Sequence, residues 1–136
     1  MEIDDVAGYT VRFFLGKQEI QPFLIKHNMY SDYAIIGLIN VHYLNDMKGS
    51  CYEKDIVTIS RKGIEWKVVR AIRKLAKKGF LKNVGEDDFL GRNYKLSNKG
   101  RKILDQYVLY LREVERDRIY QIKENKRMSI EGEKKF

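Results

Sequence analysis

The sequence predicts a mainly α-helical fold with one small β-hairpin, in the order typical of a winged helix-turn-helix. A short helical pattern, a tight turn containing Gly and a basic amphipathic pattern follow one another over residues 52–78. Two short extended runs, separated by a loop rich in Gly and Asp, come directly after them. The 136 residues are enough for one domain with a buried core.

Residues 5–30 are predicted to be helical, with a kink or break near Pro22. Apolar residues at roughly helical spacing are Val6, Tyr9, Phe13 and Ile20. Pro22 weakens a continuous helix because its nitrogen has no hydrogen to donate. Residues 31–46 predict a second helix, capped by Ser31 or Asp32, although its run "AIIGLI" is also typical of a buried strand. The apolar stripe of this helix is Tyr33, Ile36, Ile39, Tyr43 and Leu44.

The basic helix is predicted over residues 64–78, after a short helix over 52–60 and the turn "RKG". The short helix has Tyr52, Ile56 and Ile59 on one side. The inward stripe of the basic helix is Ile64, Val68, Ile72, Leu75 and Ala76, and cations occupy most other positions. Gly79 can adopt the left-handed conformation that ends a helix, with Phe80 folding back on Leu75. The helix should therefore end at Lys78.

The extended runs "FLKNV" and "NYKLS" predict a hairpin whose loop is "GEDDFLGR". Tyr94 and Leu96 should face the core, which leaves Lys95 pointing outward. Ser97 can cap a long final helix. The apolar positions of that helix are Ile103, Leu104, Tyr107, Val108, Leu111 and Val114. The pattern thins after Glu115, so residues 125–136 are predicted to be a flexible tail.

Composition excludes several classes of protein. Hydrophobic residues make up 43% of the chain, which excludes disorder over most of its length. No run approaches the roughly 18 to 20 apolar residues of a membrane span, and the N-terminus is acidic, unlike a secretory signal. The single cysteine excludes an internal disulfide. A cytoplasmic protein without membrane attachment is the expectation.

The basic charge is concentrated in one central segment. Residues 61–102 carry 14 Lys and Arg against four Asp and Glu, whereas residues 1–60 carry five against eight and residues 103–136 carry eight against seven. A charge that serves only solubility is spread along a chain, whereas a surface that meets a polyanion gathers cations on one element. This distribution favours nucleic acid as the partner, with an anionic membrane as the weaker alternative.

Residues 68–104 also resemble the MarR family of bacterial regulators. The resemblance lies in "L-x-x-K-G" at 75–79, a strand and wing, then "L-S-x-K-G" at 96–100 before a long helix. Residues 7–39 are also similar to the first helix of the family and its loop into the second, so the resemblance spans roughly residues 5–120. In one respect the chain departs from the family, because Asp88 lies four residues before Arg92, where family wings usually hold an Asp two before the Arg.

This resemblance implies a homodimer. Helices at 5–30 and 101–124 would form the dimerisation region and residues 31–100 the DNA-binding lobe, all within one domain of 136 residues. It also implies that a small phenolic or acidic effector is possible between these two regions. Aromatic residues that could line such a cleft, or equally form the dimer core, are Tyr9, Phe13, Tyr30, Tyr33 and Tyr107.

Candidate DNA contacts fall into two groups. The second helix of a helix-turn-helix enters the major groove, so residues near its start are placed to read bases. This group is Lys62, Trp66, Lys67 and Arg70. Of these, Arg70 can contact one guanine through two hydrogen bonds. Trp66 is ambiguous, because a Trp on a helix more often packs in a core or interface. Candidates for the DNA backbone or the wing contact are Arg61, Arg73, Lys82, Arg92 and Lys95.

Other chemistry finds little support. His27 and His42 lack the spacing of metal ligands, and His42 is expected to be packed. Cys51 is expected at a helix start, where backbone amides can lower a thiol pKa, but a lone Cys is usually inert. Because no phosphate loop or catalytic triad order is present, we expect a protein that is not an enzyme and needs no cofactor.

The sequence therefore predicts a homodimeric, sequence-specific DNA-binding regulator of transcription. A winged-helix module that docks on another protein is the alternative from a different class. A plasmid or phage replication or maintenance protein would use the same helix and wing on DNA.

Overall fold

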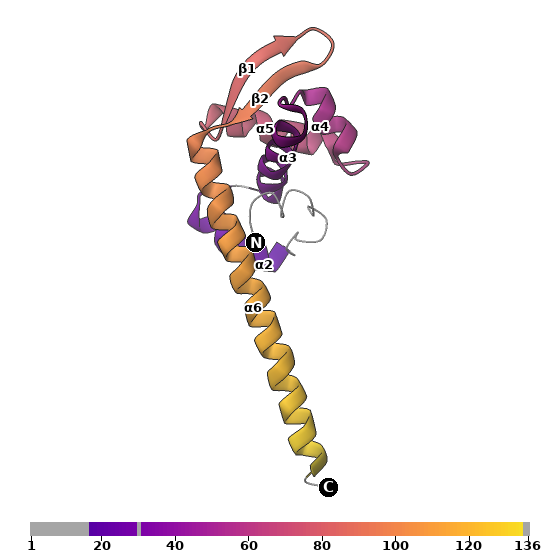
Figure 1. Ribbon diagram of the computed structural model, residues 1–136, viewed down its shortest axis with the longest axis vertical. Coiled ribbons are helices and arrows are strands. Elements are labelled where there is room, and N and C mark those ends of the chain that lie inside the picture. The colour runs from indigo at the N-terminus through magenta and orange to yellow at the C-terminus, as the bar shows by residue number, and fades with distance from the viewer. Residues whose placement is uncertain (1–16, 30, 135–136) are drawn as a thin grey trace.

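The computed structural model describes residues 17–29 and 31–134 of the chain, so the predicted helix before residue 17 lies outside the described residues. The fold is mainly helical with a two-stranded antiparallel hairpin, compatible with a winged-helix-like fold. The elements are α2 Lys17–Lys26, α3 Asp32–Lys48, α4 Glu53–Ile59, α5 Glu65–Lys77, β1 Leu81–Asp87, β2 Gly91–Leu96 and α6 Asn98–Lys134. Figure 1 shows α3, α4, α5 and the hairpin gathered at one end of the molecule, with α6 extending away from them.

Helix α3 lies at the centre of the fold. Ser31 caps its start by accepting a hydrogen bond from the Tyr33 backbone N–H at 3.1 Å, as the sequence predicts. The apolar stripe predicted for this helix covers too little of its surface, because residues on nearly every side of the helix are buried. These are Ala34, Ile35, Gly37, Leu38, Ile39, Asn40, Val41, His42 and Leu44. Helices α2, α4, α5 and α6 and strand β2 all pack around α3, which explains its continuous apolar run.

Helices α4 and α5 pack against each other across a turn at residues 60–64. Gly63 adopts a φ of 99° in this turn, a conformation that side-chain-bearing residues rarely adopt. Of the predicted inward stripe of α5, Val68, Ile72 and Leu75 are buried. Val69 and Ala71 are buried as well, so the solvent-exposed side of α5 contains fewer residues than the sequence predicts.

The end of α5 confirms the predicted geometry. The Phe80 backbone N–H donates to the Leu75 carbonyl at 3.0 Å, and the Gly79 N–H donates to the Ala76 carbonyl at 3.2 Å. Gly79 has a φ of 86°. This is the Schellman arrangement, which satisfies carbonyls at the end of the helix and turns the chain into β1.

The hairpin of β1 and β2 is longer than its sequence predicts. Glu86 pairs with Arg92 and Asp87 with Gly91, so the loop shrinks to residues 88–90. The Asp87 carboxylate accepts hydrogen bonds from the N–H groups of Phe89 (2.8 Å) and Leu90 (2.9 Å), which holds this short loop closed. Tyr94 is buried, Leu96 is half-buried and Lys95 is exposed, as predicted.

The chain segment before α4 extends the hairpin on its β2 side. The Tyr94 N–H donates to the Cys51 carbonyl at 2.8 Å, and the Lys54 N–H donates to the Leu90 carbonyl at 3.1 Å. The Asn93 side chain accepts from the Cys51 N–H at 2.9 Å. The start of α4 is thus held against the hairpin.

Helix α6 is capped by Ser97, as predicted, since the Gly100 N–H donates to the Ser97 hydroxyl at 3.1 Å. The same hydroxyl donates to the Gly79 carbonyl at 2.6 Å, which joins the start of α6 to the end of α5. The predicted tail from residue 125 is wrong, because the helix continues to Lys134. Good helix formers such as Glu, Lys and Arg sustain an exposed helix without an apolar stripe, and the Glu124–Arg127 pair supports this turn.

Helix α2 packs on the first half of α6. Phe23 contacts the rings of Tyr107 and Tyr110 at centroid distances of 5.3 and 5.5 Å, and the Arg118 guanidinium pairs with Glu19. Of the kink or break predicted near Pro22, a break is wrong, because α2 is continuous through this residue. No helix among the described residues is long and apolar enough to cross a membrane.

Candidate nucleic-acid interface

The four candidates for base contact lie together at the start of α5. Lys62 lies in the turn before the helix, and Trp66, Lys67 and Arg70 follow along its exposed side. Trp66 is 62% exposed, so packing in the core of this chain is excluded for it. The opposite side of the same helix carries Val68, Val69 and Ile72 into the core, and it therefore fixes which way these four side chains point.

The Lys67 side chain lies close to the start of α3. The Lys67 ammonium is 5.8 Å from the centroid of the Tyr33 ring, within range of a cation–π contact. Arg61, a candidate for the DNA backbone, is exposed in the turn before α5. The basic surface therefore includes the turn and is not confined to the helix.

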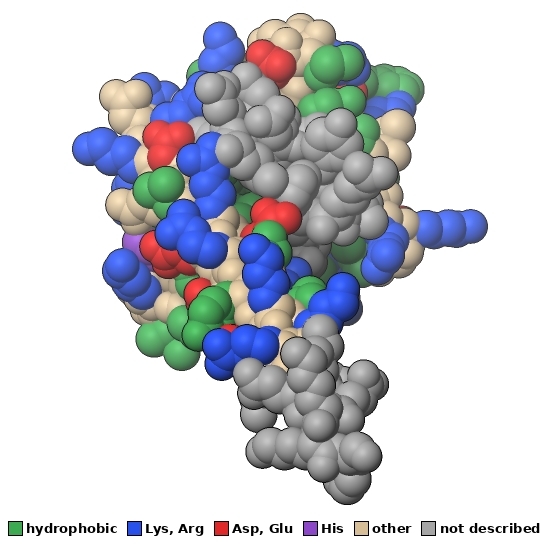
Figure 2. Space-filling view, turned by 60° about the horizontal axis from the view of Figure 1, so that its bottom comes forward, with side chains coloured by type: hydrophobic (Ala, Val, Ile, Leu, Met, Phe, Trp, Pro, Cys, Tyr) green, Lys and Arg blue, Asp and Glu red, His purple; other side chains and the backbone are tan. Residues whose placement is uncertain are grey.

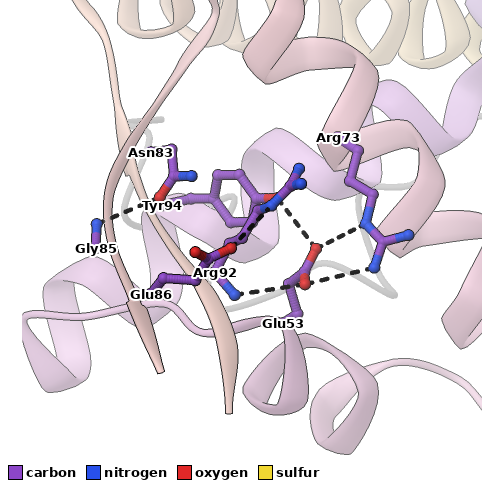
Figure 3. Close-up of polar contacts among 7 residues, drawn as sticks. All are labelled: Glu53, Arg73, Asn83, Gly85, Glu86, Arg92 and Tyr94. Carbon is purple, nitrogen blue, oxygen red and sulfur yellow. Dashed lines mark hydrogen bonds and ion pairs between the residues drawn. The ribbon is translucent and has the colours of Figure 1, made fainter. Parts of the chain in front are cut away.

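Arg73, a second backbone candidate, is held by an acid that the sequence analysis did not single out. Its Nε donates to the Glu53 carboxylate at 2.9 Å and its Nη2 donates to the other carboxylate oxygen at 3.4 Å (Figure 3). Glu53 is the first residue of α4, and its side chain is only 14% exposed. A guanidinium paired in this way is part of the scaffold as well as of the surface.

The same carboxylate also contacts the hairpin. The Tyr94 hydroxyl donates to Glu53 at 3.1 Å, and the Arg92 backbone N–H donates to it at 3.4 Å (Figure 3). Burial by itself would raise the pKa of Glu53, but the hydrogen bonds from Arg73, Arg92 and Tyr94 outweigh it and hold this pKa below its ordinary value. Glu53 therefore stays ionised while it joins α4, α5 and β2.

The pKa of Tyr94 shifts in the opposite direction to that of Glu53. Burial, followed by the negative charge of Glu53 beside it, raises the pKa of its hydroxyl to about 12. The Arg92 guanidinium interacts with this hydroxyl, which partly offsets the rise in its pKa, and lies 3.5 Å from the Glu86 carboxylate. Arg92 thus contacts two residues of the hairpin itself, and about half of its side chain stays exposed.

Lys82 and Lys95, the last two backbone candidates, form the stem of the hairpin. They lie directly opposite each other in the strand register, and both are exposed. Like charges at such cross-strand positions repel each other. An anion bound between them, such as a DNA phosphate, would relieve this repulsion.

The tip of the hairpin, residues 86–90, is negatively charged, whereas the stem is positively charged. Glu86, Asp87 and Asp88 are consecutive acids, and Phe89 is 84% exposed with the Lys54 ammonium 4.9 Å from its ring centroid. A cleft of about 590 Å³ separates this tip from α5. Its lining is Glu53, Arg73, Lys77, Glu86, Asp87, Asp88, Gly91 and Arg92.

A second hollow lies between α2, the end of α5 and α6, with a volume of about 1020 Å³. Lysines 26, 78, 99 and 102 line it together with aromatic side chains, among them Phe23 and Phe80. Of the five aromatic residues that could line an effector cleft or form the dimer core, the two within the described part of the chain do not line this hollow. Tyr107 is fully buried and Tyr33 lies elsewhere, whereas Tyr9, Phe13 and Tyr30 lie outside the described residues.

Figure 2 views the molecule from the α6 side. Lys and Arg side chains are mixed there with Asp and Glu, as is usual for a solvated surface. The outer side of α5 differs, because Glu65 is the only acid among its 13 residues.

The cysteine and the two histidines all lie in the described part of the chain, where they are not grouped into a metal site. Cys51 lies two residues before α4 and is fully buried, and burial raises the pKa of its thiol to about 12. Burial also lowers the pKa of His27, with a smaller effect from the charge of Lys26. His42 is buried, as predicted. Over residues 17–29 and 31–134 no cluster of three His, Cys, Asp or Glu side chains could hold a metal ion.

Sequence reasoning missed Glu53 because its partners lie 20 to 41 positions away and follow no helical or strand period. The local signal was limited to its place in the first turn of α4, where an acid interacts favourably with the helix macrodipole.

Comparisons of the chain with family models, with curated proteins and with solved structures find no match. The resemblance to the MarR family therefore rests on the motifs at 75–79 and 96–100 and stays a prediction.

Proposed function

We propose that this chain is a sequence-specific, double-stranded DNA-binding regulator of transcription that acts in the cytoplasm as a homodimer. Helix α5 would enter the major groove, and the hairpin would contact the flanking backbone or minor groove, as in a MarR-like winged helix-turn-helix. The observation that carries the proposal is the joint exposure of Trp66, Lys67 and Arg70 on one side of a helix whose other side is core. No cofactor and no catalytic step are part of it.

Charge supports a nucleic-acid partner. A major groove about 12 Å wide accepts one α-helix, and cations beside it release counterions from the phosphates they meet. Lys82 and Lys95 on the hairpin stem would supply such contacts, whereas the acidic tip would be repelled by phosphate. We therefore expect the part of the DNA affinity that comes from the hairpin to depend on Lys82 and Lys95 in its stem.

Exposed apolar residues support the homodimer. In Figure 1, α6 extends well beyond the rest of the fold. Large apolar side chains exposed on α2 and α6 are Ile25, Leu109, Ile119, Tyr120 and Ile122. A second copy that covered them would remove this apolar surface from water. Ile122→Asp should then shift the molar mass measured by light scattering from dimer to monomer.

Selection of bound sequences from a random duplex pool tests the function directly. It would reveal affinity, half-site spacing and dimer symmetry together. On the selected duplex, we expect Arg70→Ala to relax sequence preference, because a base contact contributes discrimination of roughly 1–3 kcal/mol. Lys95→Ala should weaken binding to all duplexes alike and lower the salt slope by about 0.9.

Lys126→Ala on the far part of α6 is the matched control, because it removes one exposed positive charge away from α5 and the hairpin. Absence of duplex affinity at low salt, or affinity that does not fall with rising salt, would contradict the proposal.

Docking on another protein is the second candidate function. The acidic tip with exposed Phe89 favours it, because acids and one apolar ring suit a basic protein surface better than DNA. A docking module would show no more than weak, nonspecific affinity for duplexes in the same selection. A replication or maintenance protein would pass that test and differ only in where its sites lie.

A further inference from the structure

We infer that Glu53 is a positioning residue, which fixes the hairpin relative to α5 and keeps Arg73 from acting as a free phosphate contact. The inference rests on the proposed function and deepens it, since the distance between helix and hairpin sets which phosphates and bases they reach together.

The hydrogen bonds of Glu53 join three elements at one carboxylate. One oxygen accepts from Arg73 Nε (2.9 Å) and from the Tyr94 hydroxyl (3.1 Å). The other accepts from Arg73 Nη2 and from the Arg92 backbone N–H, each at 3.4 Å. Figure 3 shows Arg73 and Arg92 on opposite sides of this carboxylate. Each oxygen thus contacts both α5 and β2, so a displacement of either element strains bonds to both oxygens.

Backbone packing places the hairpin directly on Glu53. A Cβ added at Gly91 would lie 2.8 Å from a Glu53 carboxylate oxygen and 3.1 Å from its Cβ. Gly91 also has a φ of 84°, which glycine adopts without strain. A larger residue at position 91 would therefore strain the backbone and displace the Glu53 carboxylate.

The pairing also changes what Arg73 can do. Two of its nitrogens already donate to Glu53, and salt bridges of this kind compete with any phosphate for the same donors. Loss of the Glu53 charge should therefore have two opposite effects. It frees Arg73 to bind phosphate, which strengthens nonspecific binding, and it releases the hairpin, which weakens discrimination.

Glu53→Gln tests this combination, because it removes the charge and keeps the shape. On the selected duplex and on a scrambled duplex of equal length, we expect the ratio of the two affinities to fall about tenfold or more. The salt slope on the scrambled duplex should rise by about 0.9 as Arg73 gains a phosphate. A role in folding stability alone would reduce both affinities in proportion and leave the slope unchanged.

Asp88→Asn is the matched control. Asp88 lines the same cleft and carries the same charge, and it is exposed in the loop of the hairpin. Its neutralisation should strengthen binding to both duplexes equally, without a loss of discrimination.

Orientation of the hairpin can be measured without DNA. Residual dipolar couplings of the ¹⁵N-labelled protein give the angle between the hairpin and α5, and hydrogen exchange reports on the Arg92 and Lys54 amides. We expect Glu53→Gln to change the angle and to speed exchange of both amides. Unchanged couplings and exchange would overturn the inference, whether or not the protein binds duplexes.

Tyr94→Phe is the alternative variant if Glu53→Gln fails to fold, because it removes the hydrogen bond from the Tyr94 hydroxyl to Glu53 and keeps the buried ring. It should shift the couplings in the same direction by a smaller amount, and no shift would count against the inference. Absence of duplex binding by the wild-type protein would refute the proposed function only, since the DNA-free measurements would still decide the role of Glu53.

Discussion

The side-chain amide of Asn45 pairs with the backbone of β2 next to Tyr94. Its nitrogen donates to the Tyr94 carbonyl at 3.0 Å, and its oxygen accepts from the Leu96 N–H at 3.3 Å. A side chain of α3 thus occupies the edge of the hairpin much as another strand would. These two bonds join the central helix to the hairpin at its base.

Asn45→Ala should destabilise the fold by roughly 1–3 kcal/mol, because it leaves two backbone groups of β2 unpaired in a half-buried position. Urea unfolding followed by circular dichroism measures this change. Asn125→Ala, on the exposed part of α6, should change the free energy of unfolding by less than about 0.5 kcal/mol. Equal effects of the two substitutions would contradict the bridging role of Asn45.

Gly100→Ala should be strongly destabilising although Gly100 lies in a helix. A Cβ there would lie 2.1 Å from the Phe80 carbonyl oxygen, which belongs to the backbone and cannot move aside cheaply. We expect a loss of roughly 2–4 kcal/mol in thermal or urea unfolding. Gly85→Ala is the control, because its Cβ would meet nothing within 4 Å, and it should leave stability nearly unchanged.

Cys51 should not react with thiol reagents in the folded protein. The side chain is fully buried, and the raised pKa of about 12 leaves almost no thiolate at pH 8. Ellman's reagent should therefore label no thiol in native protein and one per chain in urea, since the sequence holds a single cysteine. Rapid labelling of native protein at pH 8 would contradict the burial of this thiol.

Stability should fall at alkaline pH through Tyr94. An unfolded tyrosine loses its proton near pH 10, whereas folded Tyr94 keeps its proton to about pH 12. Its contribution to stability is therefore complete below pH 10 and is lost as pH rises from 10 to about 12. Urea unfolding at pH 9, 10 and 11 should show a steeper decline for wild type than for Tyr94→Phe, and parallel declines would contradict this assignment.

Trp66→Ala should leave the fold intact, because the side chain is mostly exposed, with a stability change within about 0.5 kcal/mol. Affinity for the selected duplex should fall roughly tenfold, since the loss of one base contact in a specific duplex site costs about 1–3 kcal/mol. Trp66 is the only tryptophan, so its fluorescence should also change when duplex is added to wild type. If the variant instead dissociates into monomers, Trp66 belongs to a dimer interface.

The sequence alone determined those features that depend on neighbouring residues. The Schellman end of α5 at Gly79, the Ser31 and Ser97 caps and the outward position of Lys95 were all predicted correctly. Each depends on residues within five positions or on the period of one element. Helix α5 and its exposed basic side were therefore predictable, and with them most of the candidate interface.

Only the tertiary structure decided which groups meet across elements. Glu53 reaches Arg73 and Tyr94, and Asn45 reaches β2, over separations of 20 to 51 positions. Such contacts leave no periodic pattern, so the ion pair of Arg73, a predicted DNA-backbone contact, was not anticipated, and α3 was predicted as a helix with one apolar stripe. The physical reason is that packing selects partners by position in space, whereas sequence patterns report only on the element that contains them.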